Sequence, residues 1–364
     1  MRLVAVLLGL VLVGCAAPSS ATPSAARSAA ATDALVDIGA GIQGPAGLAA
    51  TVVAAGLPNV AALAVDDEGR IWAGTAAFDD AGTDTISVVA TAGSVPRTVV
   101  RGLHTVLGLL WIDDALYVAS KERVTVYRGF DGAAFASVAT IVTFPAGVGE
   151  VNGLALGPDG RLYVGISAPC NACGTTLAES GSVVSFRVDG TDQRVVASGI
   201  RAPIGLAFVP GTTRLVVSMN QRDDLGDATP GDILGVVVEG QDWGFPACTG
   251  PGAGACSTVP TPLAMLDTHA AASGVAIVTG QFGASVGTAA VVAEWAKGGV
   301  LRASRDAATT VSAEPFLSGF TSPVAVTVDG SRALLVGDWG AGTIIRIATA
   351  RRNLSIESFH SADT

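Results

Sequence analysis

The chain has 364 residues, of which 49% are hydrophobic and only 14% are charged, with 46 glycines and a formal net charge of −10. Soluble domains ordinarily carry about 25% charged residues, so this protein is poor in charge and rich in turn-forming residues. A nucleic-acid-binding protein is excluded because the sequence has no Lys/Arg block. Scarce charged helix formers disfavour a coiled coil, and the high apolar content disfavours a disordered chain. A globular protein rich in β-strands is expected.

The N-terminus has the form of an export signal. One positive side chain, Arg2, precedes an unbroken run of apolar and small residues over 3–14, which is too short to span a membrane as a helix. The run ends at Leu12–Cys15 (LVGC), which resembles the lipobox of bacterial lipoproteins. This resemblance implies that Cys15 is acylated and becomes the new N-terminus. An ordinary secreted protein is the alternative.

These features predict how the N-terminal region is organised. Residues 1–14 are expected to be a lipoprotein signal peptide, and residues 15–44 the lipidated cysteine with a tether rich in Ala, Ser and Pro. We therefore expect an exported protein, anchored to the bacterial cell membrane by lipid alone and facing the periplasm or the cell exterior.

Two short apolar strands joined by a tight turn recur six times downstream of the tether. The strand pairs are 61–65 with 71–75, 107–112 with 115–120, 153–156 with 162–166, 204–209 with 215–219, 274–278 with 288–295, and 324–328 with 333–339. Successive turns are 45, 46, 51, 69 and 50 residues apart, a period that suits a four-stranded propeller blade. Seven blades are the main alternative, and an α/β fold is disfavoured because no amphipathic helix separates the strands.

The fold expected is all-β, a six-bladed β-propeller of four-stranded antiparallel blades over residues 45–350, with a tail over 351–364. The sixth unit lacks an outer strand at its C-terminal end. Ala49–Ala55, which is followed by a Gly-Leu pair, has the form of the outer strand that precedes Gly102. We therefore predict that this N-terminal strand completes the last blade, which removes exposed sheet edges.

Four cysteines remain after the signal, an even number in an oxidising compartment. They are Cys170, Cys173, Cys248 and Cys256. Cys170 and Cys173 lie within one expected loop, and Cys248 and Cys256 lie within another, so two local disulfides are the simplest arrangement. Three pairings are possible, and the sequence does not choose among them. A zinc site is disfavoured outside the cell.

Propeller topology brings two sets of loops to one face, namely those entering each innermost strand and those joining the second and third strands. Most of the unusual polar residues fall in these loops: His104, Lys121, Arg123, Glu150, Asn152, Arg201, Arg222, Asp223, Asp224, Asp227, His269 and Lys297. Loops held by a rigid scaffold are where binding residues concentrate. We therefore expect the functional site on this face.

One acidic run is a candidate for binding Ca²⁺. Asp223, Asp224, Asp227 and Asp232 lie within ten residues, interrupted by Gly and Pro, and carboxylates are hard oxygen ligands. The run lacks the spacing of an EF-hand loop. Alternatively, Arg222 pairs with a neighbouring Asp and the loop satisfies its own charges.

Three segments together resemble the glucose/sorbosone dehydrogenase family: 199–208 (GIRAPIGLAF), 220–227 (NQRDDLGD) and 240–248 (GQDWGFPAC). Further similarity at 157–173, at His269 and at 340–346 extends the resemblance over about residues 45–348. The resemblance implies a six-bladed propeller that oxidises sugars with pyrroloquinoline quinone and Ca²⁺, by hydride transfer from a sugar hydroxyl to the quinone.

The chain departs from this family at the chemical centre. The family places a catalytic His shortly before the position of Asn152, where this sequence reads Gly-Val-Gly-Glu150-Val and has no His. The family's Arg-Asn pair reads Arg201-Ala202 here. Candidate replacement bases are Glu150, His104 and His269. Candidate cofactor-binding residues are Arg201, Asn152, Lys121, Arg123 and Lys297.

Three functions are therefore open. The first is an exported quinoprotein dehydrogenase acting on an aldose or a sorbosone-type sugar, in which one of the candidate bases substitutes for the missing His. The second is a catalytically degenerate propeller that binds a sugar or a protein partner. The third is a Ca²⁺-dependent hydrolase of the lactonase type, which needs Glu, Asn and Asp ligands converging from several blades.

Overall fold

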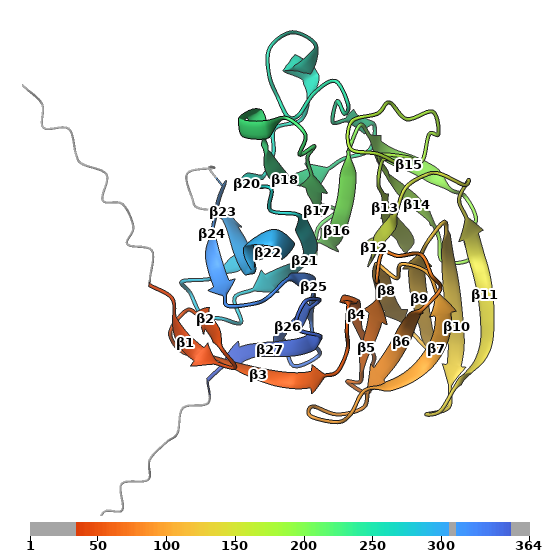
Figure 1. Cartoon of the computed structure of the whole chain (residues 1–364), viewed down its shortest axis with the longest axis vertical. Coiled ribbons are helices and arrows are strands. Elements are labelled where there is room, and N and C mark those ends of the chain that lie inside the picture. Colours follow the sequence, from red (N-terminus) through yellow and green to blue (C-terminus); the bar gives the residue numbers. More distant parts are fainter. Residues whose placement is uncertain (1–33, 306–310, 351–364) are drawn as a thin grey trace, which may run out of the picture. The chain divides into compact units, whose positions relative to one another are not determined.

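Short runs of β-branched and apolar residues, ended by glycine turns, form the strands of this protein. The structure is a computed structural model that describes residues 34–305 and 311–350. These residues form six antiparallel sheets arranged as the blades of a propeller, with the first strand of each blade nearest the centre of the ring (Figure 1). The predicted all-β fold with six four-stranded blades is confirmed.

The strands follow the chain from blade to blade. Blade one is β4 (Val60–Val65), β5 (Ile71–Thr75), β6 (Asp84–Val89) and β7 (Arg97–Leu103). Blade two is β8 (Gly108–Ile112), β9 (Ala115–Ser120), β10 (Arg123–Phe130) and β11 (Phe135–Thr143). Blade three is β12 (Val151–Leu156), β13 (Arg161–Ile166), β14 (Ser182–Arg187) and β15 (Arg194–Ser198). Blade four is β16 (Ala202–Phe208), β17 (Leu215–Asn220), β18 (Gly231–Val237) and β20 (Ala264–Thr268). Blade five is β21 (Ala272–Thr279), β22 (Thr288–Glu294), β23 (Gly299–Arg305) and β24 (Val311–Ser318). Blade six is β25 (Pro323–Val328), β26 (Leu334–Asp338), β27 (Thr343–Thr349) and β3 (Leu48–Ala55).

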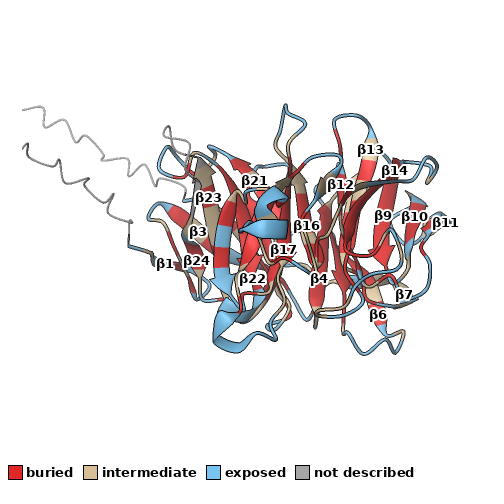
Figure 2. Cartoon of the chain, turned by 90° about the horizontal axis from the view of Figure 1, so that it is seen from above, coloured by how far each residue is buried: buried red, intermediate tan, exposed pale blue. Residues whose placement is uncertain are grey.

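The blades are held together by apolar side chains on both faces of each sheet. Six buried clusters among the described residues each join two neighbouring blades. Val291 of blade five and Val336 of blade six, for example, lie in one cluster and are fully buried. Burial on both faces explains why these strands are continuous apolar runs rather than alternating ones. The edge view shows buried strands between two exposed layers of loops (Figure 2).

The N-terminal strand closes the ring as predicted, because β3 pairs antiparallel with β27 over Leu48–Ala55. The prediction that residues 15–44 are tether is wrong over its last part. There β1 (Val36–Gly39) and β2 (Ile42–Gly44) form a hairpin, and Gln43 pairs with Ser318 at the outer edge of blade five. The apolar side chain of Ile42, which is 2% exposed, anchors this hairpin in the cluster between blades five and six. The predicted signal peptide, Cys15 and the tail over 351–364 lie outside the described residues.

Both cysteine pairs form local disulfides. Cys170 is bonded to Cys173 and Cys248 to Cys256, which confirms the simplest pairing. The second bridge lies in an insertion of blade four, where β19 (Gln241–Asp242) pairs parallel with β15 of blade three. Trp243 then fills the cluster between these two blades.

Helical structure among the described residues is limited to three short 3₁₀ turns, η1 (Gly226–Ala228), η2 (Gly254–Thr258) and η3 (Trp295–Lys297). No helix in this part of the chain has the length and apolar character needed to cross a membrane.

Small residues let the innermost strands approach one another at the axis. A Cβ added to Gly153 would lie 2.7 Å from the carbonyl oxygen of Ile204 in the next blade, and one added to Gly274 would lie 2.6 Å from that of Val324. Gly108 and Gly205 meet the following blade in the same way. Alanine occupies the matching position in the other two blades, at Ala62 and Ala325. Contact between backbones at the axis therefore requires a small residue at this position.

We expect Gly153→Ala to lower the free energy of unfolding by about 1–3 kcal/mol, because a methyl group there overlaps the backbone of the next blade. Gly330→Ala is the matched control, since a Cβ at Gly330 meets open space and should change stability by less than about 0.5 kcal/mol. Denaturant unfolding of both variants tests this. Equal stabilities would mean that the axis is not tightly packed.

Candidate functional site

A cavity of about 260 Å³ lies above the axis, on the face that carries the loops entering the innermost strands. Its floor is formed by residues that lie in an inner strand or directly before one, and each of them precedes one of the small axial residues: Leu107, Asn152, Ile204, Ser273 and Val324. In four of these strands the pairing register shifts at this point. Such bulges re-aim side chains, and here the re-aimed residues are the ones that line the cavity.

The wall of the cavity comes from the two sets of loops that topology places on this face. Glu150 and Arg201 belong to the entry loops of blades three and four, and Ser167 and Asn220 follow or end the second strands of the same blades. The structure thus brings together three residues predicted from the sequence, Glu150, Asn152 and Arg201.

Two buried amide oxygens in the cavity wall have no hydrogen-bond partner among the described residues. The amide nitrogen of Asn152 donates to Ser167 Oγ at 3.0 Å and to the carbonyl oxygen of Pro203 at 2.9 Å, whereas its Oδ1 is unpaired. Asn152 is fully buried. The Oδ1 atom of Asn220 is also buried and unpaired. An unpaired buried acceptor costs about 1–3 kcal/mol, so both oxygens are suited to accept from a ligand.

The cavity wall contains one guanidinium and one carboxylate among the described residues. Arg201 is partly buried, and its Nε donates to the carbonyl oxygen of Asn171 at 3.4 Å, beside the Cys170–Cys173 bridge. Glu150 is exposed, and its carboxylate makes no ion pair or hydrogen bond within the described part of the chain.

Two aromatic residues that the sequence analysis did not single out complete the wall. Phe78 and Trp295 line the cavity with side chains that are respectively 58% and 38% exposed. Trp295 is supported from behind by Trp339, with ring centroids 6.0 Å apart, and Trp339 Nε1 donates to the carbonyl oxygen of Ala76. An exposed aromatic side chain that is held in place as Trp295 is can contact a ligand.

Several other predicted site residues lie elsewhere. His104, Lys121 and Arg123 line a separate concavity between blades one and two. There Asp80 bridges two of them, since its Oδ1 pairs with His104 Nδ1 at 2.8 Å and its Oδ2 with Lys121 Nζ. Lys121 and then His104 lower the pKa of the Asp80 carboxyl.

His269 and Lys297 are exposed and are not among the residues that line the cavity. The structure therefore separates five of the predicted residues from Glu150, Asn152 and Arg201: His104, His269, Lys121, Arg123 and Lys297.

The acidic run does not form a metal site in the described structure. Arg222 pairs with both oxygens of Asp224 at 2.8 Å, as the alternative reading of the run expects. Among residues 34–305 and 311–350, no three His, Cys, Asp or Glu side chains are arranged to hold a metal ion.

Asp232 is a structural acid rather than an exposed ligand. It is 4% exposed, and its two oxygens accept from the backbone N–H groups of Gln221 at 2.8 Å and Ala272 at 2.9 Å. The second bond joins blade four to blade five. Asp84 joins blade one to blade two in the same way, accepting from Thr105 N at 2.7 Å.

Burial also changes the acidity of groups beside the cavity. Desolvation raises the pKa of Asp232, although its backbone hydrogen bonds and Arg201 oppose the shift. Glu294, which directly precedes Trp295, is 1% exposed and accepts from Asp267 N at 3.2 Å. Burial raises the pKa of Glu294 from 4.5 to about 7.

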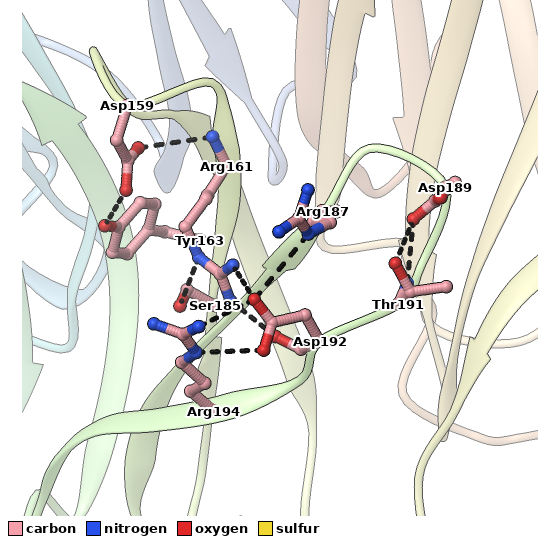
Figure 3. Close-up of polar contacts among 9 residues, drawn as sticks. All are labelled: Asp159, Arg161, Tyr163, Ser185, Arg187, Asp189, Thr191, Asp192 and Arg194. Atoms are coloured by element: carbon pink, nitrogen blue, oxygen red, sulfur yellow. Dashed lines mark hydrogen bonds and ion pairs between the residues drawn. The ribbon is translucent and has the colours of Figure 1, made fainter.

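A larger concavity of about 370 Å³ lies between blades three and four. It is lined by residues of the turns that join the first and second strands of these blades, so it lies on the face opposite the central cavity. Its charged groups are largely paired with one another. Asp192 accepts from Arg161 at 2.8 Å and from both Nε and Nη2 of Arg194, and Arg187 lies 3.6 Å away (Figure 3). Asp159 accepts from the Tyr163 hydroxyl. This network has the character of a structural cluster.

The lining of the central cavity supplies few cations for the carboxylates of pyrroloquinoline quinone. The quinone carries three carboxylates, which need several cationic groups, whereas this cavity offers Arg201 alone against the like charge of Glu150. The unpaired Asn152 and Asn220 oxygens are acceptors, so they would not bind carboxylate oxygens directly, whereas oxygens of this kind are ligands for Ca²⁺.

Comparison with solved structures shows which proteins share the fold. An aldose sugar dehydrogenase from Streptomyces coelicolor, solved with PQQ bound, is 22% identical with a TM-score of 0.64, covering 84% of this chain and 99% of that one. A soluble aldose sugar dehydrogenase from Escherichia coli is 15% identical with a TM-score of 0.65, covering 83% and 100%. A Trichoderma reesei enzyme of carbohydrate-active family AA12, solved with calcium, is 14% identical with a TM-score of 0.69, covering 87% and 98%.

No protein-family model and no curated protein sequence matches the chain. The fold is that of the soluble sugar dehydrogenases, as the sequence motifs predict. At these levels of identity the likeness concerns the fold.

The raised pKa of Glu294 predicts a pH dependence of stability. Between pH 4.5 and about 7 the folded state holds a proton that the unfolded state has lost, so the free energy of unfolding falls as pH rises through this range. Glu294→Gln removes this contribution, of up to about 3 kcal/mol, and retains an acceptor for Asp267 N. Denaturant unfolding at pH 5, 6, 7 and 8 should give a flatter profile for the variant than for the wild type; parallel profiles would contradict the raised pKa.

Proposed function

We propose that this protein is a sugar-binding propeller of the dehydrogenase type that holds a single sugar in its central cavity. The observation that carries the proposal is the pair of buried, unpaired oxygens, Asn152 Oδ1 and Asn220 Oδ1, in one cavity wall. Sugar hydroxyls are donors that satisfy such acceptors. The exposed rings of Phe78 and Trp295 provide apolar surface for the C–H faces of a sugar.

Support for a carbohydrate ligand also comes from the fold, since the solved proteins that share it are named as dehydrogenases of sugars or as carbohydrate-active enzymes. The cavity is open to solvent at one face and lies where six rigid strands meet. Preformed concave sites with few polar groups are typical of small-molecule binding.

Quinone-dependent oxidation of a sugar is the second candidate function. It is favoured by Arg201, which the family resemblance assigns to the cofactor and which the structure places in the cavity. The charge mismatch described above and the absence of a His at the family's position weigh against it. Glu150 is the group in this cavity that would accept the hydroxyl proton.

Isothermal titration calorimetry with aldoses tests whether the protein binds a sugar and which residues contribute to the affinity. We expect wild-type protein to bind an aldose, and Asn220→Ala to weaken binding about tenfold, because one hydroxyl loses its acceptor. The same variant should be as stable as the wild type without ligand, since it removes an unsatisfied buried oxygen. Gln193→Ala, an exposed amide far from the cavity, is the control and should change neither property. A wild-type protein that binds no sugar would overturn the proposal.

The two candidate functions are distinguished by adding pyrroloquinoline quinone and Ca²⁺ to the same protein. Sugar binding that is independent of both, with no reduction of a dye acceptor, is the result expected from the geometry. Sugar-dependent dye reduction would replace the first function by the second.

We also propose that the protein is exported and anchored through a lipid on Cys15. Support comes from the apolar run that ends at Cys15 and from the two disulfides, which are stable in an oxidising compartment. Cys15→Ser should abolish incorporation of labelled fatty acid and release the protein from the membrane fraction. Retention of both label and membrane association would contradict the anchor.

A further inference from the structure

We infer that the Cys170–Cys173 disulfide controls sugar binding in the central cavity, because it closes the short loop that positions the guanidinium of Arg201. Reduction of this bond weakens binding while the propeller stays folded. This role rests on the proposed function and adds a redox-sensitive site to it. Three features of the molecule support it, namely the contacts of the loop with the cavity wall, the scarcity of other bonds that hold the loop, and the exposure of the disulfide.

The segment that follows β13 bonds to the cavity wall at several points. Ser167 N donates to the carbonyl oxygen of Glu150 at 3.0 Å, and Ser167 Oγ accepts from the side-chain amide of Asn152 at 3.0 Å. Ala168 N donates to the carbonyl oxygen of Arg201 at 2.7 Å. Both Ser167 and Ala168 line the cavity themselves. The segment thus contacts all three of the predicted residues that share this cavity.

The disulfide loop continues this segment and supports the side chain of Arg201. Between the two cysteines lies Asn171, whose carbonyl oxygen accepts from Arg201 Nε at 3.4 Å and whose Oδ1 accepts from the backbone N–H of Asp223 at 3.4 Å. Within the described part of the chain, the Arg201 side chain forms no ion pair and no second hydrogen bond. Its Nη1 and Nη2 groups can therefore donate to the oxygen atoms of a sugar. The direction of these donors depends on Asn171.

Few other bonds hold this loop in place. In the described structure, no backbone group of residues 169–176 bonds to another backbone group. The two contacts of Asn171 are long for N–H···O bonds, so each is weak by itself. The disulfide joins residues that are 3 positions apart, which restricts Asn171 to a small region beside Arg201. Segments with few hydrogen bonds open at a low cost in free energy, and we expect this loop to do so once the S–S bond is broken.

The disulfide is accessible to a reductant. Cys170 is exposed and Cys173 is partly exposed, whereas Cys248 of the other disulfide is only 5% exposed. Thiol–disulfide exchange requires a thiolate to reach one of the sulfur atoms. A dithiol reductant attacks one sulfur and breaks the S–S bond, and a second exchange releases two cysteine thiols as the dithiol closes to its own disulfide. Two electrons and two protons pass from the dithiol to the protein in this reaction.

Loss of a fixed guanidinium should lower the affinity for a sugar. Hydrogen bonds from a charged donor are among the strong ones, so we expect reduction of the Cys170–Cys173 bond to weaken sugar binding about tenfold. By linkage, a bound sugar favours the oxidised form of the protein by the same factor. Saturating sugar should therefore lower the reduction potential of this disulfide by about 30 mV.

Isothermal titration calorimetry with D-glucose tests this role in matched variants. We expect Cys170→Ser combined with Cys173→Ser to bind glucose about tenfold more weakly than the wild type. The control is Cys248→Ser combined with Cys256→Ser, which opens the other disulfide. Neither Cys248 nor Cys256 lines the cavity, so this control should bind glucose within about twofold of the wild type.

Two further measurements use the same variants. The control variant retains the Cys170–Cys173 bond, and its glucose affinity should fall about tenfold in dithiothreitol and recover on reoxidation. A double-mutant cycle tests whether the disulfide acts through Arg201. Arg201→Ala should weaken binding about tenfold, and opening Cys170–Cys173 in that variant should cost less than about a further twofold.

The outcomes distinguish this role from the proposed function. Glucose affinity that is unchanged when Cys170–Cys173 is opened, or that falls as far in the Arg201→Ala variant as in the wild type, overturns the role and leaves sugar binding standing. Wild-type protein that binds no glucose overturns both. Circular dichroism of each variant, with and without reductant, checks the fold, and loss of the β-sheet signal on opening Cys170–Cys173 would contradict a local effect on binding.

Discussion

Close contact between the six innermost strands at the axis is the constraint on which the rest of this structure depends. Each strand carries a glycine or alanine at this level, so the ring closes with no side chain larger than a methyl group between neighbouring strands. One residue earlier in the chain, the register of five inner strands shifts, and side chains such as Asn152 and Ser273 line the cavity on the loop face. The same feature that packs the axis thus builds the floor of the cavity.

Buried acids join neighbouring blades on the loop face by hydrogen bonds. Asp84 and Asp232 lie at the start of the third strand in blades one and four. Asp84 accepts a backbone N–H from the loop that enters blade two, and Asp232 accepts one from the first residue of blade five. These bonds hold entry loops without using an exposed ionic pair, which contributes little to stability. A chain with only 14% charged residues therefore uses several of its carboxylates inside the fold, and the unpaired Glu150 stands out against this background.

Much of the architecture could be predicted from the sequence because its repeat is strong. Six strand pairs with similar spacing define six blades, and the shape of the segment before Gly56 indicates ring closure by Ala49–Ala55, which β3 confirms. The hairpin over 36–44 was missed, because a run of Ala, Gly and single apolar residues differs little from a tether. Its pairing depends on Ser318, which lies far along the chain.

The site was harder to predict, for a physical reason. Loop position identified Glu150, Asn152 and Arg201, but the partner of each charged residue decides its role. Lys121 pairs with Asp80, a residue 41 positions earlier, and this contact holds it in a separate concavity. The role of Asp232 is likewise set by Ala272, 40 positions later. Trp295 could have been identified from the sequence, because it is a large aromatic residue that directly follows the second strand of blade five, where the chain reaches the loop face.

The central claim is that the cavity above the axis receives a sugar whose donors satisfy Asn152 Oδ1 and Asn220 Oδ1. A crystal structure of the protein grown with D-glucose tests this most directly. The account predicts one sugar in the central cavity, with hydroxyl donors within hydrogen-bond distance of both amide oxygens. A sugar seated elsewhere, or one in the cavity that leaves both amide oxygens unpaired, would contradict it.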